Sequence, residues 1–227
     1  IYWSNTEFWL FLSSATSIIS ISLLNDFFRR NPPTIWEFGK EVSNFSIFLI
    51  QLYILKQPLQ ELSKRLSGSL FFDDLHKTMY ATDASVYRKI PLAVAYPRGV
   101  SDIQKLIYFA LKHKISLIPR TAGTSLAGQC VGEGIVVDVS KHFTNIIDVD
   151  VEAKTVVVQP GVIRDDLNRY LKPYGLFFGP NTSTSNRCMI GGMVGNNSSG
   201  TTSIQYWVTR DKVLSLDCLL SDGSQVS

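Results

Sequence analysis

A loop of small and hydroxylated residues, Pro-Arg-Thr-Ala-Gly-Thr-Ser-Leu-Ala-Gly-Gln at positions 119–129, is the first feature of the sequence that could do chemistry. Small residues let the backbone turn tightly and point successive N–H groups at one place, which makes an anion-binding nest suited to a pyrophosphate. Thr124 and Ser125 add hydroxyl donors. The loop is neither a Walker loop nor a G-x-G-x-x-G motif, so a Rossmann dinucleotide site is not supported. A polar surface loop is the alternative interpretation.

A second cluster of glycines and small polar residues occupies positions 179–185 and 190–200. Paired glycines permit a flat ring or a phosphate to approach the backbone closely, and the side chains of Asn196 and Asn197 offer amide hydrogen bonds. The alternative is a glycine-rich turn in which asparagine side chains bond to their own backbone. Two such clusters in one small domain favour a large ligand that has both phosphate groups and a planar part.

The first cluster is positioned by elements that alternate between strand and helix. Apolar runs predict strands at residues 92–96, 117–118 and 135–139, the second ending at Pro119. Residues 101–104 read Ser-Asp-Ile-Gln, a capping box, and apolar residues follow it at helical spacing. A strand, a helix and a strand with such short links form a βαβ unit, so the first two strands are expected to be parallel.

Further elements are predicted on both sides of this unit. They are, in chain order, a helix at 58–66, a β-hairpin at 146–151 and 155–159, a helix at 163–171 and a strand at 213–220. Acidic residues at 165 and 166 favour the start of the helix at 163–171, and Gly175 favours its end. Asp222-Gly223 is a hairpin turn signal.

Charge and cysteine usage exclude several classes of function. Lysine and arginine number 22 against 19 acidic residues, a net charge of +3, and they form no basic tract, so nucleic acid is not an indicated partner. Cys130, Cys188 and Cys218 lie far apart without a C-x-x-C pair, which argues against a disulfide framework or a zinc site, and no metal ligands are expected. The three histidines lie outside both clusters, and no residue is assigned a catalytic role.

Residues 1–56 differ in composition from the rest of the chain and are rich in Phe, Ile, Leu and Ser. Residues 8–24 carry no charge, but as a helix they would span roughly 25 Å, less than the ~30 Å of a bilayer core. The segment is interpreted as a membrane span, an accessory apolar helix or translated upstream sequence foreign to the domain. Membrane association is therefore left open.

Together the two clusters resemble the FAD-binding domain of the vanillyl-alcohol oxidase and p-cresol methylhydroxylase (PCMH) superfamily. Within it, the chain is most similar to FAD-linked D-lactate dehydrogenases and to the FAD-linked subunit of glycolate oxidase. The resemblance covers about residues 59–226, and its anchors are residues 80–87, Pro91, Pro97, 120–129 and 186–211. It implies an α+β fold, a PCMH-type FAD-binding domain truncated at the C-terminus. Its two α/β subdomains would hold a small parallel βαβ sheet and a mixed or antiparallel sheet with helices.

The resemblance also sets the expected domain boundaries. Residues 1–56 are an apolar N-terminal segment of uncertain status, residues 57–142 the first FAD-binding subdomain, and residues 143–227 an incomplete second one. The chain is accordingly expected to be an N-terminal fragment that has no turnover by itself. Where relatives usually have Tyr-Gly, this chain has Tyr206-Trp207, and a bulky indole there would distort the bend.

Cofactor contacts are carried over from the family residue by residue. The expected FAD-binding residues are Arg120, Thr121, Ala122, Gly123, Thr124, Ser125, Gly128, Gln129, Pro180, Asn181, Thr184, Gly191, Gly192, Asn196, Asn197 and Gly200. The amides of residues 121–125 would hold the pyrophosphate, and Pro180, Asn181 and Thr184 would border the isoalloxazine. Some members attach flavin covalently through a histidine where this chain has Thr124, so FAD is expected to bind non-covalently.

The function that the resemblance implies is hydride transfer from the α-carbon of a 2-hydroxy acid, of D-lactate or glycolate type, to flavin N5. The protein would supply positioning and electrostatics, and the redox chemistry would belong to the cofactor. The electron acceptor is left open, with an iron–sulfur module or a quinone as candidates. Two alternatives are a non-enzymatic FAD-binding module and a membrane-associated flavoprotein subunit of an electron-transfer complex. The expected location is the cytoplasm, with peripheral attachment to the inner membrane as the alternative.

Overall fold

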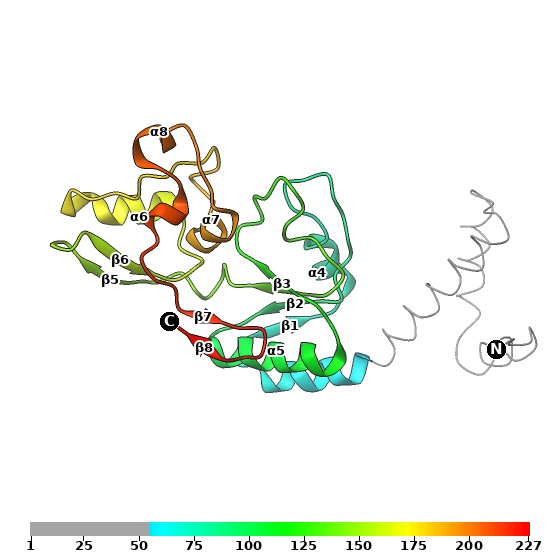
Figure 1. The fold of residues 1–227 in the computed structure, drawn as a ribbon. Coiled ribbons are helices and arrows are strands. Elements are labelled where there is room, and N and C mark those ends of the chain that lie inside the picture. Colours follow the sequence, from blue (N-terminus) through cyan, green and yellow to red (C-terminus); the bar gives the residue numbers. More distant parts are fainter. Residues whose placement is uncertain (1–54) are drawn as a thin grey trace, which may run out of the picture. The chain divides into compact units, whose positions relative to one another are not determined.

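The computed structural model describes residues 55–227, of which residues 56–227 form one compact unit (Figure 1). The uncharged stretch at 8–24, with its three interpretations, lies outside the described residues. In the part of the chain that the structure describes, no helix is both long enough and apolar enough to cross a membrane.

A four-stranded sheet forms the core of the first half, with strand order β1-β2-β4-β3. The strands are β1 (Ser69–Phe71), β2 (Ala93–Tyr96), β3 (Leu117–Arg120) and β4 (Ile135–Asp138). β4 pairs in parallel with both β2 and β3, whereas β1 pairs antiparallel with β2. The predicted parallel arrangement is confirmed, with β4 inserted between the first two predicted strands. Pro119 lies within β3 and does not end it, because β3 is an edge strand where a missing N–H is tolerated.

Three helices accompany this sheet. They are a helix that covers residues 55–65 of the described chain, α4 (Asp74–Met79) and α5 (Val100–His113). The predicted capping box is wrong, because α5 begins at Val100 and Gly99 is its N-cap without a side-chain bond. The carboxylate of Asp102 instead accepts hydrogen bonds from the backbone N–H groups of Ser67, Gly68 and Arg98, outside the helix.

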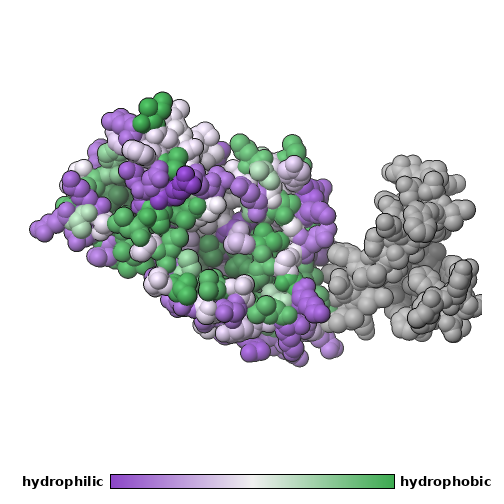
Figure 2. Space-filling view, viewed as in Figure 1, coloured by the Kyte–Doolittle hydropathy of each residue, from purple (hydrophilic) through white to green (hydrophobic). Residues whose placement is uncertain are grey.

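The second half begins with the predicted hairpin and helix. The antiparallel pair β5 (Ile146–Asp150) and β6 (Thr155–Val158) is followed by α6 (Arg164–Leu171) and the 3₁₀ turn η1 (Lys172–Tyr174). One side of the hairpin packs on a cluster that includes the buried Leu167, Cys188 and Met193. Ile147 and Val157 remain at least half exposed, and Figure 2 shows apolar side chains gathered around this part of the surface.

The chain then forms short elements. They are α7 (Ile190–Asn196), α8 (Ser203–Tyr206), η2 (Thr209–Lys212), β7 (Cys218–Leu219) and β8 (Gln225–Val226). The strand predicted at 213–220 is wrong in extent, because only β7 pairs, and its partner is β8. Asp222 and Gly223 form the predicted turn. This hairpin lies along α5 (Figure 1), where the Gln104 side chain donates to the Gly223 carbonyl.

Candidate cofactor site

The loop after β3 is braced at its start by Arg120. The guanidinium lies 5.0 Å from the centre of the Tyr80 ring and donates to the carbonyl of Thr82 over 2.8 Å. The Tyr80 hydroxyl in turn donates to the buried Asp138 at the end of β4. Burial, followed by this bond to a carboxylate, raises the pKa of Tyr80 well above its usual range, so the phenol stays protonated.

Two glycines give the loop its shape. Gly123 and Gly128 have φ values of +66° and +70°, a left-handed conformation that costs L-residues with a side chain about 1 kcal/mol. The Tyr87 ring covers Gly128, since a Cβ there would lie 2.7 Å from the ring. The carbonyl of Gly123 accepts a hydrogen bond from the Ala84 amide over 3.2 Å, which fixes the way the loop faces.

The amides predicted to hold a pyrophosphate are unused. Among the described residues, the N–H groups of Ala122, Gly123, Thr124 and Ser125 donate to no acceptor. All four residues are partly buried. Consecutive free amides on a bent backbone form an anion-binding concavity. Free amides at four consecutive residues are what the nest interpretation requires, and that interpretation stays a prediction.

Helix α7 contacts both ends of this loop and so brings the two clusters together. At one end, a Cβ on Gly192 would lie 2.6 Å from the Thr121 hydroxyl. At the other end, the Gln129 side-chain amide donates to the Oδ1 of Asn196 over 2.8 Å. Gly195 lies between these contacts, and a Cβ there would meet no heavy atom within 4 Å. Gly195 is thus an exposed position of α7 with open space over it, in the turn between the two contacts.

The remaining predicted residues form a second group around the segment before α7. Arg164 of α6 donates from Nε to the carbonyl of Pro180 over 3.1 Å, and Thr202 donates to the carbonyl of Gly179 over 2.9 Å. A Cβ on Gly200 would collide with the backbone carbonyl of Asn181. Among the described residues, no hydrogen bond joins this group to the loop after β3. The structure thus brings the loop to α7, and residues 180–184 to Gly200.

Asn181 carries a buried acceptor that lacks a donor. Its Oδ1 has no hydrogen-bond partner among the described residues. A buried polar atom without a partner costs about 1–3 kcal/mol, and an ordered water or a bound group can complete its bonding. Thr184, by contrast, is used locally, since its carbonyl accepts from Arg187 and Cys188.

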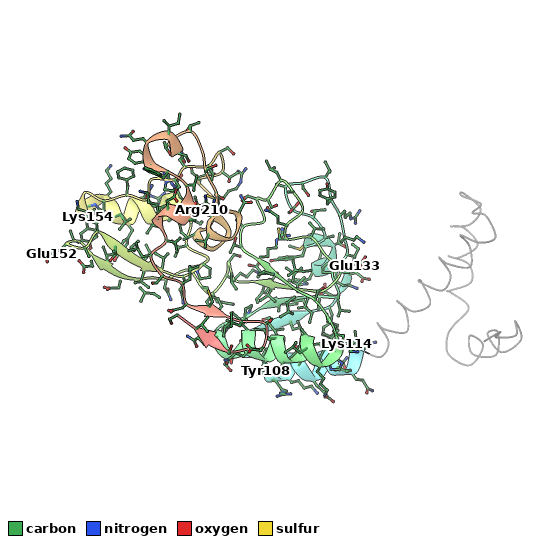
Figure 3. All side chains as sticks on the ribbon, viewed as in Figure 1. Tyr108, Lys114, Glu133, Glu152, Lys154 and Arg210 are labelled. Carbon is green, nitrogen blue, oxygen red and sulfur yellow. The ribbon has the colours of Figure 1, made fainter. Side chains whose placement is uncertain are left out.

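The other predicted residues are mainly structural in their contacts. Gly191 packs on Pro160. Asn197 ends α7 with φ +47°, and its Oδ1 accepts from the backbone amide of Arg210, which is labelled in Figure 3. The sequence reasoning missed Arg164 and Asn168, which hold the carbonyl of Phe178 from α6. The sequence shows the amphipathic pattern that predicts helix α6, but this pattern gives no signal for these polar contacts.

Two carboxylates hold the segments that flank the site. Burial alone would raise the pKa of Asp83, but hydrogen bonds from Ser85 and from the Cys130 thiol bring it below its usual value. The side-chain bond from Arg164 lowers the pKa of Asp165, which also accepts from the hydroxyl of Ser185 over 3.0 Å. Both groups are therefore ionised at neutral pH and serve as acceptors for loop backbone and hydroxyls.

A mixed α+β fold that carries free backbone amides beside a glycine-rich helix has the features expected of a domain for an anionic cofactor. Residues 91–227 match the model of the FAD binding domain, and the chain belongs to this family. FAD is accordingly its cofactor, and the resemblance drawn from the two clusters is confirmed. The division at residue 142 and the roles of single residues stay predictions.

Curated relatives agree with this assignment. The chain is 40% identical over 162 residues to D-2-hydroxyglutarate dehydrogenase of Pseudomonas putida, a match covering 70% of the chain and 16% of the relative. It is 35% identical to glycolate oxidase subunit GlcD of Bacillus subtilis, covering 75% of the chain and 37% of that protein. The chain thus spans well under half the length of these relatives.

A solved structure shares the fold. Wild-type Physcomitrella patens BBE-like 1 superposes with a TM-score of 0.65 at 19% sequence identity, covering 74% of this chain and 37% of the other. At that identity the likeness concerns the fold alone. The PCMH-type α+β architecture expected from the sequence is confirmed.

Proposed function

We propose that this chain is the FAD-binding part of an oxidoreductase that moves hydride from the α-carbon of a 2-hydroxy acid to flavin N5. The proposal is supported by the names of relatives at 35–40% identity, which are a 2-hydroxyglutarate dehydrogenase and a component of glycolate oxidase. When bound, FAD supplies the redox chemistry, and the protein binds and orients it. The proposal names the substrate of the whole protein as a class only, the 2-hydroxy acids.

The observation that carries the proposal is the set of free amides at residues 122–125 beside the open face of α7 at Gly195. Free backbone amides stabilise negative charge without a titratable group, so the loop would hold the pyrophosphate at any physiological pH. Arg120 holds the start of the loop through its hydrogen bond to the Thr82 carbonyl and its contact with the Tyr80 ring. As a guanidinium, it stays charged. It is therefore proposed to orient the loop and not to transfer protons.

The ring would lie toward the second group of residues. There the unpaired Oδ1 of Asn181 offers an acceptor, and Gly200 lies against the Asn181 backbone carbonyl, where no side chain would fit. An isoalloxazine carries an imide N–H that can satisfy such an acceptor. Gly191, Gly192, Asn197 and Gly200, with Pro180 and Thr184, are proposed to line the same site.

Attachment of the flavin is proposed to be non-covalent because Thr124 stands where some relatives use a histidine. A threonine hydroxyl without an adjacent base is a poor nucleophile. Acid precipitation of the FAD-loaded protein is expected to leave all of the yellow colour in the supernatant. Colour that stays with the pellet would contradict this part of the proposal.

Oxidoreductase function is tested in a chimera. The 162 matched residues of the Pseudomonas putida D-2-hydroxyglutarate dehydrogenase are replaced by those of this chain. The chimera is expected to bind FAD and to lose its flavin absorbance when D-2-hydroxyglutarate is added without oxygen. A chimera that binds one FAD but is not bleached, while the parent enzyme is, would contradict the proposal and favour a non-enzymatic FAD-binding module.

A further inference from the structure

Four side chains form a continuous chain of hydrogen bonds between the loop after β3 and the end of α7. Ser125 Oγ donates to Gln129 Oε1 over 2.6 Å, and Gln129 Nε2 donates to Asn196 Oδ1 over 2.8 Å. Asn196 Nδ2 then donates to Ser198 Oγ over 3.2 Å. The two amides are 67 positions apart in the sequence, so this chain joins the two glycine-bearing clusters directly.

Each polar atom of the two amides already has a protein partner in this arrangement. Oε1 and Nε2 of Gln129 bind Ser125 and Asn196, and Oδ1 and Nδ2 of Asn196 bind Gln129 and Ser198. Ser125 Oγ also accepts from the backbone amides of Ala127 and Gln129 over 3.3 Å each, which holds the turn of the loop closed. The side-chain amides of Gln129 and Asn196 thus bond to the protein, whereas the family resemblance led us to expect that they bond to the cofactor.

The loop is consequently held by α7 at both ends. Thr121 packs against Gly192 near the start of the helix, and Gln129 bonds to Asn196 at its last residue. The free backbone amides of Ala122 to Ser125 lie in the part of the loop between Thr121 and Gln129. A loop held by α7 at one end only would sample more conformations, and FAD binding would have to order it.

We propose that Gln129 and Asn196 are positioning residues that act on FAD through the spacing of the loop and α7, without contacting it. The inference rests on the proposed FAD site and assigns these two residues a different role within it. The bridge pre-organises the free amides, so that its loss weakens FAD binding and speeds FAD release. One exposed neutral hydrogen bond supports an effect of about three- to tenfold in the dissociation constant.

A swap of the two amides separates this role from direct contact. Gln129→Asn shortens the bridge by one methylene and Asn196→Gln lengthens it by one, so the double variant restores its total length. Each single variant is expected to raise the dissociation constant and the release rate of FAD, measured by flavin fluorescence. The double variant is expected to return to within about twofold of the parent chain. Gln225→Asn, on the exposed strand β8, is the control and leaves both quantities unchanged.

Hydrogen exchange in the FAD-free chain gives a second readout. The amides of residues 122–125 are expected to exchange faster in each single variant and at the parental rate in the swapped pair, whereas the exchange of β2 stays constant. Additive weakening of FAD binding in the double variant, or single variants with parental binding and exchange, would overturn the inference. A parent chain that binds no FAD would instead overturn the proposed function.

Discussion

The loop after β3 and the segment that contains α7 both depend on glycine, but for different physical reasons. In the loop, Gly123 and Gly128 take positive φ values, so glycine supplies a backbone conformation. In the second segment, none of the glycines has a positive φ; Gly192 and Gly200 permit close approach to Thr121 and to the Asn181 carbonyl. Glycine thus permits a positive φ in the loop after β3 and a close approach of two segments in the region that contains α7.

This difference predicts which substitutions each region tolerates. Strain from a positive φ costs a roughly fixed amount per residue and is local. A collision with another backbone segment forces two parts of the chain apart and cannot be relieved by a rotamer change. The second segment is therefore expected to be the more sensitive of the two to an added methyl group.

The largest effect is expected for Gly200→Ala. Its Cβ would collide with the backbone carbonyl of Asn181, and separating the two segments is expected to cost about 3 kcal/mol of unfolding free energy. Gly195→Ala is the matched control, because its Cβ meets no atom within 4 Å and alanine favours the helix by about 0.5–1 kcal/mol. Urea unfolding of both variants measures the difference. Equal stability of the two would break the comparison.

The two halves of the described chain are expected to differ next in acid sensitivity, through Asp102 of α5 in the first half and Asp165 of α6 in the second. Burial alone would raise the pKa of Asp102, but the N–H groups of Ser67, Arg98 and Gly68 lower it overall. Because the pKa is lower in the folded state, the stabilisation is complete above the unfolded value and is lost as the pH falls through the folded one.

Asp102→Asn is accordingly expected to cost about 2 kcal/mol at neutral pH, the size of hydrogen bonds to a charged group, and progressively less in acid. Asp165→Asn in α6 is the counterpart in the second half of the chain, with a more exposed carboxyl and a smaller expected loss. Urea unfolding between pH 7 and about pH 3 measures both. A pH-independent loss for Asp102→Asn would show that its charge is not what binds the three amides.

A smaller effect is expected for Gly123→Ala in the loop. The positive φ costs about 1 kcal/mol, and the new methyl group would press on the guanidinium of Arg120, which is flexible enough to move. FAD affinity is expected to fall together with stability, since Arg120 then loses its bond to Thr82. A loss as large as that of Gly200→Ala would contradict the distinction between conformation and contact.

The smallest expected change is a gain. Trp207 follows α8 with φ +67° and ψ −165°, a region used almost only by glycine, while its side chain is 64% exposed. Trp207→Gly is expected to stabilise the chain by about 1 kcal/mol, because strain is relieved and little packing is lost. A thermal melt measures this, with Trp207→Ala as the control that keeps the strain. A destabilised glycine variant would show that the indole is held by packing.

The sequence predicted the elements whose pattern is local. The buried runs at β2 and β4, the amphipathic α5 and α6, and the hairpin β5–β6 are all found near their expected positions. Strand β1 and helix α4 were missed because three and six residues are too short to show a period. The alternating residues before β7 do not pair, since alternation indicates a strand only where a partner lies alongside.

The candidate site was predictable to a similar degree. Glycine clusters identified both regions, and Trp207 was singled out as a residue in a place suited to glycine. The bridge between Gln129 and Asn196 was not predictable, because it depends on how distant segments meet. The same holds for Arg164, whose partners are carbonyl groups that every residue has.

The most direct test of the account is equilibrium binding of FAD to the Gly195→Leu variant. Leucine would project into the open space over α7, where its Cβ meets no heavy atom within 4 Å, and it favours the helix more than glycine does. Ala153→Leu is the control, at the tip of the β5–β6 hairpin between Glu152 and Lys154, away from α7 (Figure 3). We expect Gly195→Leu to melt at or above the parental temperature while FAD affinity falls by about a hundredfold, and Ala153→Leu to bind normally. Parental FAD affinity in a well-folded Gly195→Leu variant would contradict the placement of the cofactor between the loop and α7.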